Sequence, residues 1–184
     1  MVIERLQTPS DEELDALTDL WEASVQATHD FLAAEDIPFF RRMVRGEALP
    51  AADLYVIRDT DGEAGKTGGF AAFAGIDGDM LEMLFVAPEA RGKGLGRQLV
   101  EYLVGERGVR RVDVNEQNTQ AAGFYARLGF RVTGRDAADP SGRPYPILHL
   151  SLGKAWTGIV PIPSLQTDRI DVDFQIEATG EKGK

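Results

Sequence analysis

The chain contains no cysteine, and only two of its 184 residues are histidine. Without cysteine there is no disulfide bond, no thiolate metal site and no cysteine nucleophile. The two histidines, His29 and His149, lie far apart in the sequence, and no cluster of carboxylates accompanies them. We therefore expect no metal site. A cysteine-free chain also suits a reducing compartment, and we expect a cytoplasmic protein.

Long apolar runs and an excess of basic residues are also missing. The first residues, Met1–Arg5, lack the apolar run of a signal peptide, and no later stretch is long enough to cross a bilayer. We therefore expect no membrane partner. Thirty acidic residues against twenty basic ones give a net charge of −10. This field repels nucleic-acid phosphates, so we expect no nucleic-acid partner, and it mildly favours a cationic one.

Apolar periodicity predicts two helices in the N-terminal part of the chain. Ser10 and Glu13 form a capping-box pattern, in which each side chain bonds the backbone amide of the other. Apolar residues then recur at helical spacing from Leu14 to Val25. A second helical segment, Phe39–Val44, follows Pro38, which is tolerated in the first turn of a helix.

Apolar runs separated by short turns predict strands around and after these helices. The first is expected over Val2–Leu6, ahead of the first helix. Three more follow the second helix, over Leu54–Ile57, Phe70–Ile76 and Met80–Val86. Because their connections are short, we expect these three strands to form an antiparallel meander.

The rest of the chain up to residue 152 alternates between helical and strand patterns. We expect a helix over Leu95–Val104, a strand over Val109–Val114 and a second helix over residues 119–128. A final hairpin is expected from strands over 130–133 and 146–150. A strand, a helix and a further strand imply a parallel pair with a right-handed crossover. The predicted fold class is therefore α/β (α+β), with a mixed, mostly antiparallel central sheet, a parallel pair in its middle and helices on both faces.

The end of the chain carries a separate strand pattern. Apolar and mostly acidic residues alternate from Ile170 to Glu177, which predicts one amphipathic strand at about residues 169–178. We divide the chain into a domain over 1–152 and an extension over 153–184 whose role is unknown. The apolar face of this strand needs a cover. It could pair with the protein's own sheet or exchange across a homodimer.

A glycine cluster lies between a predicted strand and a predicted helix. Gly92, Gly94 and Gly96 leave the backbone open to a ligand, and the first amides of a helix have no partner within it. Together with the helix dipole, these amides form a site suited to a pyrophosphate. The G-x-G-x-x-G dinucleotide pattern fails, because its last glycine would fall on Arg97 or Leu99.

The pattern that does fit is R/Q-x-x-G-x-G/A, present as Arg91-Gly92-Lys93-Gly94-Leu95-Gly96. Asn118 and the run Gly123–Phe130 follow at the appropriate spacing. Over residues 1–152 the chain resembles the GNAT superfamily of N-acetyltransferases. Residues 27–32, 114–118 and 142–146 are similar to its bacterial YjaB-type branch. The resemblance implies transfer of an acetyl group from acetyl-CoA directly to a primary amine of a small molecule or peptide. A non-catalytic acyl-CoA-binding sensor is the alternative.

The resemblance also implies roles for individual residues. The cofactor-binding positions are Leu84, Phe85, Val86, Arg91, Gly92, Lys93, Gly94, Leu95, Gly96, Arg97, Asn118, Phe124 and Tyr125. The backbone of Phe85 and Val86 would pair with the pantetheine arm, and the amides from Gly92 to Arg97 would hold the pyrophosphate. Asn118 either steadies the pantetheine or caps the helix that follows, and the two roles are compatible. Tyr125 would protonate the leaving thiolate.

The attacking amine must be neutral, so a base is expected. Glu82 is one candidate, because strand alternation puts it on one face with Leu84 and Val86. His29 is the other, because it lies at the end of the first helix, a region that lines the acceptor site in this superfamily, and imidazole titrates in a suitable range. Both residues also have an ordinary structural interpretation. The sequence does not name the acceptor.

Overall fold

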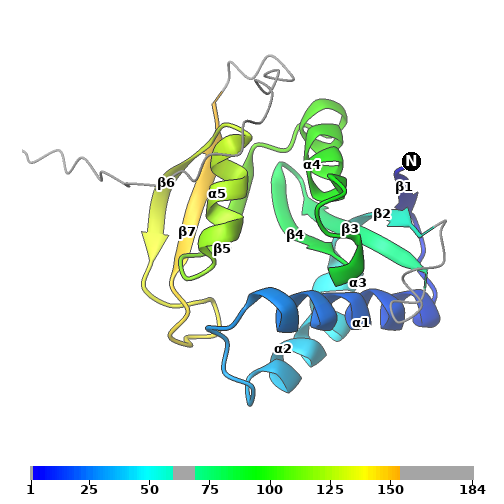
Figure 1. The fold of residues 1–184 in the computed structure, drawn as a ribbon, viewed down its shortest axis with the longest axis horizontal. Helices are drawn as coiled ribbons and strands as arrows, with labels where there is room; N and C mark the ends of the chain where they lie inside the picture. The colour runs from blue at the N-terminus through cyan, green and yellow to red at the C-terminus, as the bar shows by residue number, and fades with distance from the viewer. Residues whose placement is uncertain (1, 60–68, 154–184) are drawn as a thin grey trace, which may run out of the picture.

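The computed structural model describes residues 2–59 and 69–153 (Figure 1). Within them, seven strands form one sheet: β1 (Glu4–Leu6), β2 (Asp53–Arg58), β3 (Phe70–Asp77), β4 (Met80–Val86), β5 (Arg111–Asn115), β6 (Phe130–Asp136) and β7 (Ile147–Leu152). Their spatial order is β1-β2-β3-β4-β5-β7-β6. Only β4 and β5 are parallel neighbours. The predicted mixed, mostly antiparallel sheet is confirmed.

Four of the five α-helices in the described part of the chain lie where periodicity predicts them. The five are α1 (Asp11–Thr28), α2 (Ile37–Met43), α3 (Leu49–Ala51), α4 (Leu95–Glu106) and α5 (Thr119–Arg127), and the short α3 was not predicted. A π-helical turn, η1 (Val44–Ala48), joins α2 to α3, and a 3₁₀ turn, η2 (Pro88–Ala90), follows β4. The predicted second helix therefore continues into a wider turn instead of ending at Val44.

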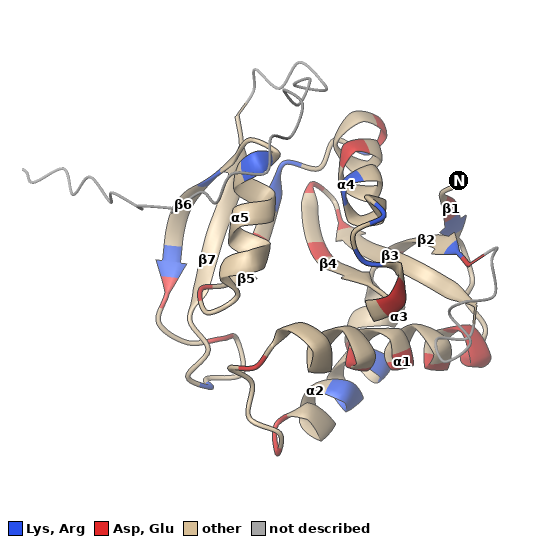
Figure 2. Ribbon diagram, viewed as in Figure 1, with Lys and Arg blue, Asp and Glu red and all other residues tan. Residues whose placement is uncertain are grey.

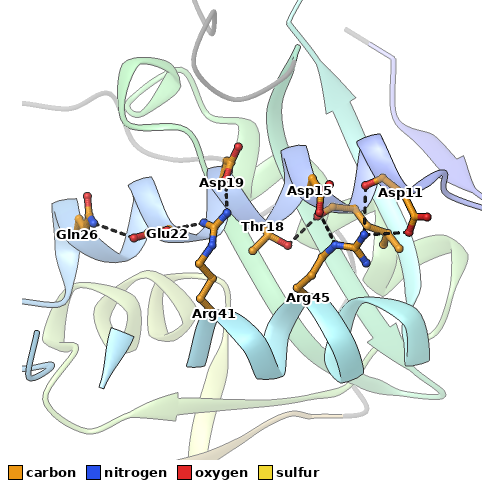
Figure 3. A network of polar contacts seen from close by, with 9 residues as sticks. Asp11, Asp15, Thr18, Asp19, Glu22, Gln26, Arg41 and Arg45 are labelled. Carbon is orange, nitrogen blue, oxygen red and sulfur yellow. Dashed lines mark hydrogen bonds and ion pairs between the residues drawn. The ribbon is translucent and has the colours of Figure 1, made fainter. Parts of the chain in front are cut away.

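Helix α1 is fixed at its start and along both of its faces. The capping box forms as predicted, with both Ser10–Glu13 bonds at 3.2 Å. One face is buried, and the other holds the following segment through ion pairs (Figure 3). Arg41 of α2 pairs with Asp19 and Glu22, and Arg45 of η1 pairs with Asp15 and Asp11. Helix α2 is therefore fastened to α1.

Helices cover both faces of the central strands. The ring of Phe85 in β4 lies 6.5 Å from that of Trp21, so α1 packs on this face. A Cβ atom at Gly96 of α4 would contact Leu84 and Val86, which point the other way along β4. Because both faces are covered, β3 is buried along Phe70–Ile76 and reads as a continuous apolar run.

Strand β4 carries a bulge at Glu82. In the ladder with β3, Gly75 lies opposite Met83, whereas the next residue, Ile76, lies opposite Leu81. Glu82 is thus the extra residue of β4 in this ladder. Burial still alternates here, with Glu82 exposed between the buried Leu81 and Met83, so the placement of Glu82 on one face with Leu84 and Val86 stays a prediction.

Strands β4 and β5 pair only where they begin. The register joins Met80 to Arg111 and Leu81 to Val112, and no further pair follows. Beyond that point β4 remains bonded to β3, while β5 remains bonded to β7 as far as Asn115. The sheet therefore opens into a wedge at the C-terminal ends of β4 and β5. Helix α4 begins beside β4 at this end, and α5 follows directly after β5 (Figure 1).

Two sequence predictions fall outside the described residues. The amphipathic strand at about 169–178, and with it the homodimer contact, belong to the extension over 153–184, of which only Gly153 is described. Within residues 2–59 and 69–153, no helix is long and apolar enough to cross a membrane.

Candidate active site

A cavity of about 410 Å³ occupies the wedge. Four parts of the chain line it: the end of α1, the last three residues of β4, the glycine segment that opens α4, and α5. Most of the predicted site residues meet there, namely His29, Leu84, Phe85, Val86, Arg91, Gly92, Gly94, Leu95, Gly96, Arg97, Asn118, Phe124 and Tyr125. Of the predicted set, Lys93 and Glu82 are not among the lining residues.

The start of α4 has the geometry of an anion site. Gly92 and Gly94 have φ values of 77° and 81°, a left-handed conformation that favours glycine. Gly94 is the N-cap, and its carbonyl accepts the first helical bond from the Gln98 amide at 3.0 Å. The amides of the first helical turn therefore have no partner inside the helix. They suit a phosphate, as the sequence predicts.

Basic residues lie along the segment that opens this helix, in an otherwise acidic chain (Figure 2). Arg91 donates to Gln120 of α5 at 2.6 Å, which ties the glycine segment to the opposite side of the wedge. Arg97 pairs with Glu101 one turn further along α4. Both arginines line the cavity. Their positive charge adds to that of the helix terminus and favours an anionic ligand.

The backbone of β4 has hydrogen-bonding groups directed into the wedge. The Ala87 amide bonds the Ala71 carbonyl on β3, which fixes the phase of the antiparallel ladder. Phe85, opposite Phe73, then bonds toward β3, whereas Leu84 and Val86 direct their N–H and C=O groups toward the wedge. An extended chain could pair there as a further strand. The geometry therefore favours Leu84 and Val86, rather than Phe85, as the residues whose backbone pairs.

Asn118 joins two parts of the cavity wall. Its side-chain oxygen accepts the Ala121 amide at 3.0 Å, so it caps α5, which was one of its two predicted roles. Its amide nitrogen lies 3.5 Å from His29 Nε2. The remaining surface of Asn118 lines the cavity. Capping α5 therefore leaves this side chain accessible to a ligand.

His29 has a defined tautomer in this network. The Thr28 hydroxyl donates to the Ser24 carbonyl at 2.8 Å, so it accepts from His29 Nδ1 at 2.7 Å. The network thus assigns the proton to Nδ1 and a lone pair to Nε2, which faces Asn118. Burial lowers the pKa of His29 to about 4, and Asp30 only partly opposes this shift. The ring is therefore neutral at pH 7.

Tyr125 is a protonated hydroxyl group at the cavity wall. The residue is 6% exposed, and its ring packs against Phe124 and Phe130 at 5.0 and 5.6 Å between centroids. Burial raises the pKa of Tyr125 well above its usual value, so the phenol keeps its proton at neutral pH. Its hydroxyl makes no hydrogen bond with the described residues. It is thus available to a ligand in the cavity.

Glu82 lies apart from these groups, on the exposed bulge of β4. The pKa of Glu82 is raised by burial and by the carboxylates of Asp113 and Asp77, while Arg111 opposes the shift. The cavity brings His29, Asn118 and Tyr125 together but does not include Glu82. The role of Glu82 as a base stays a prediction.

Sequence reasoning missed several residues that line the cavity, namely Ser24, Thr28, Ala90, Gln120 and Arg127. Ser24 and Thr28 are one helical turn apart and precede His29, so their spacing was a usable signal. Arg127 similarly lies one turn after Gly123 on α5. Among residues 2–59 and 69–153, no group of three or more His, Asp or Glu side chains is arranged to hold a metal ion.

Comparison with known proteins agrees with this geometry. Residues 50–132 match the family model described as "Acetyltransferase (GNAT) domain". The chain is 42% identical over 141 residues to "Peptidyl-lysine N-acetyltransferase YjaB" of Escherichia coli, an alignment that covers 76% of this chain and 90% of that protein. The chain belongs to the GNAT family of acetyltransferases.

Two further comparisons support this membership. The protein of the same name from Salmonella typhimurium is 41% identical over 140 residues, covering 76% of this chain and 91% of that protein. The solution structure of apo YjaB from Escherichia coli superimposes with a TM-score of 0.70 at 38% identity, covering 86% of this chain and 100% of that one. The predicted resemblance is confirmed. This GNAT enzyme is an N-acetyltransferase that moves an acetyl group from acetyl-CoA to an amine.

His29 should make the stability of this acetyltransferase depend on pH. Its pKa is about 4 in the folded state and about 6.5 in the unfolded state. Between these values the unfolded state binds more protons, so stability that is complete above about pH 6.5 is lost as the pH falls toward 4. We expect the thermal midpoint to fall less between about pH 7.5 and 5 in His29→Gln than in wild type, as measured by circular dichroism.

The second histidine is the matched control for this prediction. Hydrogen bonding to Asp113 and Asp136 raises the pKa of His149, which is an effect of opposite sign. His149→Gln should therefore not flatten the profile. A profile for His29→Gln as steep as that of wild type would contradict the burial of a neutral His29.

Proposed function

We propose that the acceptor is the ε-amine of a lysine in a peptide or protein. The relatives from Escherichia coli and Salmonella typhimurium carry the name peptidyl-lysine N-acetyltransferase, and they match most of this chain. We also propose direct transfer in a ternary complex. The main observation in support of direct transfer is that the backbone of β4, the neutral ring of His29 and the protonated hydroxyl of Tyr125 line one cavity.

The residues of the wedge fit the cofactor. The amides from Gly92 to Arg97 would hold the pyrophosphate, the backbone of Leu84 and Val86 would pair with the pantetheine arm, and Asn118 would steady it. When bound, acetyl-CoA supplies an activated acetyl thioester. The small residues Gly96 and Ala121 leave the space between α4 and α5 open.

Tyr125 is the proposed proton donor to the departing sulfur. Its raised pKa keeps the phenol protonated in the resting enzyme, and proton donation helps to expel a thiolate from a tetrahedral intermediate. Edge-to-face contacts with the rings of Phe124 and Phe130 restrict the rotation of its side chain. The hydroxyl is therefore held at the cavity wall without a competing hydrogen bond from the described residues.

His29 is the proposed first acceptor of the proton from the amine. The Nε2 atom of His29 lies near Asn118, and both residues line the cavity. Because the pKa of His29 is lowered to about 4, Nε2 carries no proton at pH 7. Glu82 lies outside the lining, so a role for it would require proton passage through water. A cytoplasmic location is proposed because the chain has no cysteine.

The acceptor class is tested with matched amines. One substrate is an N-terminally blocked peptide with a single lysine, and the others are the same peptide with arginine in place of lysine, free lysine and a small polyamine. Release of coenzyme A should depend on the lysine peptide, with kcat/KM at least about tenfold above that of the free amines, since a peptide adds contacts beyond the reacting group. Equal or better rates with the free amines would overturn the peptide assignment.

A further inference from the structure

The loop before β7 is fastened to the segment between α1 and α2 through one carboxylate. The Tyr145 hydroxyl donates to Asp36 Oδ2 at 2.6 Å, and Arg143 Nε donates to Asp36 Oδ1 at 3.0 Å. These partners lie 109 and 107 residues apart in the sequence. A bond from a charged group is stronger than one between neutral groups. We call Asp36, Arg143 and Tyr145 the Asp36 clamp.

Tyr145 is the most enclosed member of this clamp. It is 5% exposed, and its hydroxyl also accepts the Ala33 amide at 3.1 Å. Its ring lies between those of Phe31 and Phe40, with centroids 6.3 and 6.1 Å away. One hydroxyl thus bonds both the backbone and a side chain of the α1–α2 segment. Losing it would leave the half-buried Ala33 amide without its partner.

Arg143 contacts both Asp36 and the ring of Phe39. Its guanidinium lies 3.7 Å from the centroid of the Phe39 ring, which is close enough for a cation–π interaction. The preceding turn is shaped by Asp139, whose carboxylate accepts the Arg143 amide at 2.8 Å. Arg143 therefore approaches Asp36 from a defined turn.

The clamped segment begins at His29, one of the groups that line the cavity. The His29 ring lies 5.1 Å from Phe31, which in turn contacts Tyr145. At its other end the segment leads into α2, which Arg41 fastens to α1 (Figure 3). The segment is therefore held on the α1 side by ion pairs and on the β7 side by the Asp36 clamp.

We propose that Asp36 and Tyr145 are positioning residues for the acceptor, because they hold the His29-bearing segment as the acceptor-side wall of the cavity. This inference rests on the proposed function, because it takes the acceptor to be a lysine peptide. The cofactor side is separate, because neither residue lines the cavity and the clamped segment reaches it only through His29. Breaking the clamp should therefore change acceptor binding and leave acetyl-CoA binding unchanged.

The variants are Tyr145→Phe, which keeps the ring but loses the hydroxyl, and Asp36→Asn, which loses the charge. Each should raise KM for the lysine peptide about tenfold, as expected for a hydrogen bond to a charged group. The thermal shift produced by acetyl-CoA should stay as in wild type. Because both changes break one contact, their effects in the double variant should not add. Tyr102→Phe, on the exposed face of α4, is the matched control.

A second measurement does not depend on activity. The chain has two histidines, so their imidazole proton resonances can be titrated separately by NMR and assigned with His149→Gln. The pKa of His29, about 4 in wild type, should rise toward its ordinary value in Tyr145→Phe, since a loosened wall admits water. If wild type acetylates no lysine peptide, the proposed function fails, while this titration still tests the clamp.

Two outcomes would overturn the positioning role. One is a peptide KM and a His29 titration that both match wild type in Tyr145→Phe and Asp36→Asn. The other is an equal weakening of acetyl-CoA binding, which would show a general structural effect. If either variant fails to fold, Arg143→Lys removes the Nε bond to Asp36 and the guanidinium contacts with Ser141 and Phe39 but keeps the Tyr145–Asp36 bond, and it should shift both readouts in the same direction by a smaller amount.

Discussion

Tyr125→Phe should lower kcat by about 10²-fold or more, the range in which positioned proton donors act. The substitution removes the phenol hydroxyl that Tyr125 presents at the cavity wall, and it keeps the ring packing against Phe124 and Phe130. Because the hydroxyl makes no hydrogen bond with the described residues, its loss leaves no buried partner unsatisfied. The fold should therefore be unaffected.

The measurement is steady-state release of coenzyme A with the lysine peptide, together with the thermal shift caused by acetyl-CoA. We expect kcat to fall while the thermal shift stays within error of wild type, since the interaction is made in the transition state. Tyr102→Phe controls for loss of a hydroxyl at a distance from the cavity. A kcat for Tyr125→Phe within about twofold of wild type would contradict the role of Tyr125 as proton donor.

Gly96→Phe should abolish the thermal stabilisation by acetyl-CoA. A Cβ atom at Gly96 would lie 3.6 Å from Val86 and 3.8 Å from Leu84 and Phe124, which are ordinary contacts. A larger side chain must extend into the wedge, where the pantetheine arm is proposed to lie. For wild type, ligand at about 100 times Kd adds about 2.7 kcal/mol, or roughly 5–10 °C in a domain of this size.

Two matched variants separate filling of the wedge from damage to α4. Gly96→Ala fits the same position with ordinary contacts and should keep the stabilisation. Gly105→Phe places the same large side chain on the same helix, where a Cβ atom meets nothing within 4 Å, and should also keep it. A full thermal shift in folded Gly96→Phe would show that the ligand does not occupy the wedge.

Local patterns were sufficient for most of the fold. The capping box at Ser10 and the apolar spacing from Leu14 to Val25 specify α1, because both signals lie within a few residues. The meander of β2, β3 and β4 follows from short connections. The bulge at Glu82 could not be predicted in this way, since it depends on how β4 pairs with β3. A bulge is defined by the pairing of two strands, and the alternation of apolar and polar residues within one strand does not reveal it.

The site shows the same division between local and distant information. The glycine cluster, the cap at Asn118 and the Tyr125 position follow from motifs that are continuous in sequence. The contact of Asn118 with His29 joins residues 89 positions apart, and only the fold reveals it. The Asp36 clamp is equally distant. Single-sequence reasoning could propose His29 as a base, but it could not give its tautomer or its lowered pKa.

The most direct test of the wedge as the cofactor site is an NMR titration of the ¹⁵N-labelled protein with coenzyme A. We expect the largest amide shifts at Leu84, Val86 and the residues from Gly92 to Arg97, where backbone groups face the cavity. Amides on the far side of the sheet, such as those around His149, should shift little. Saturable shifts that cluster away from the wedge, with none at Val86 or Gly94, would contradict the site.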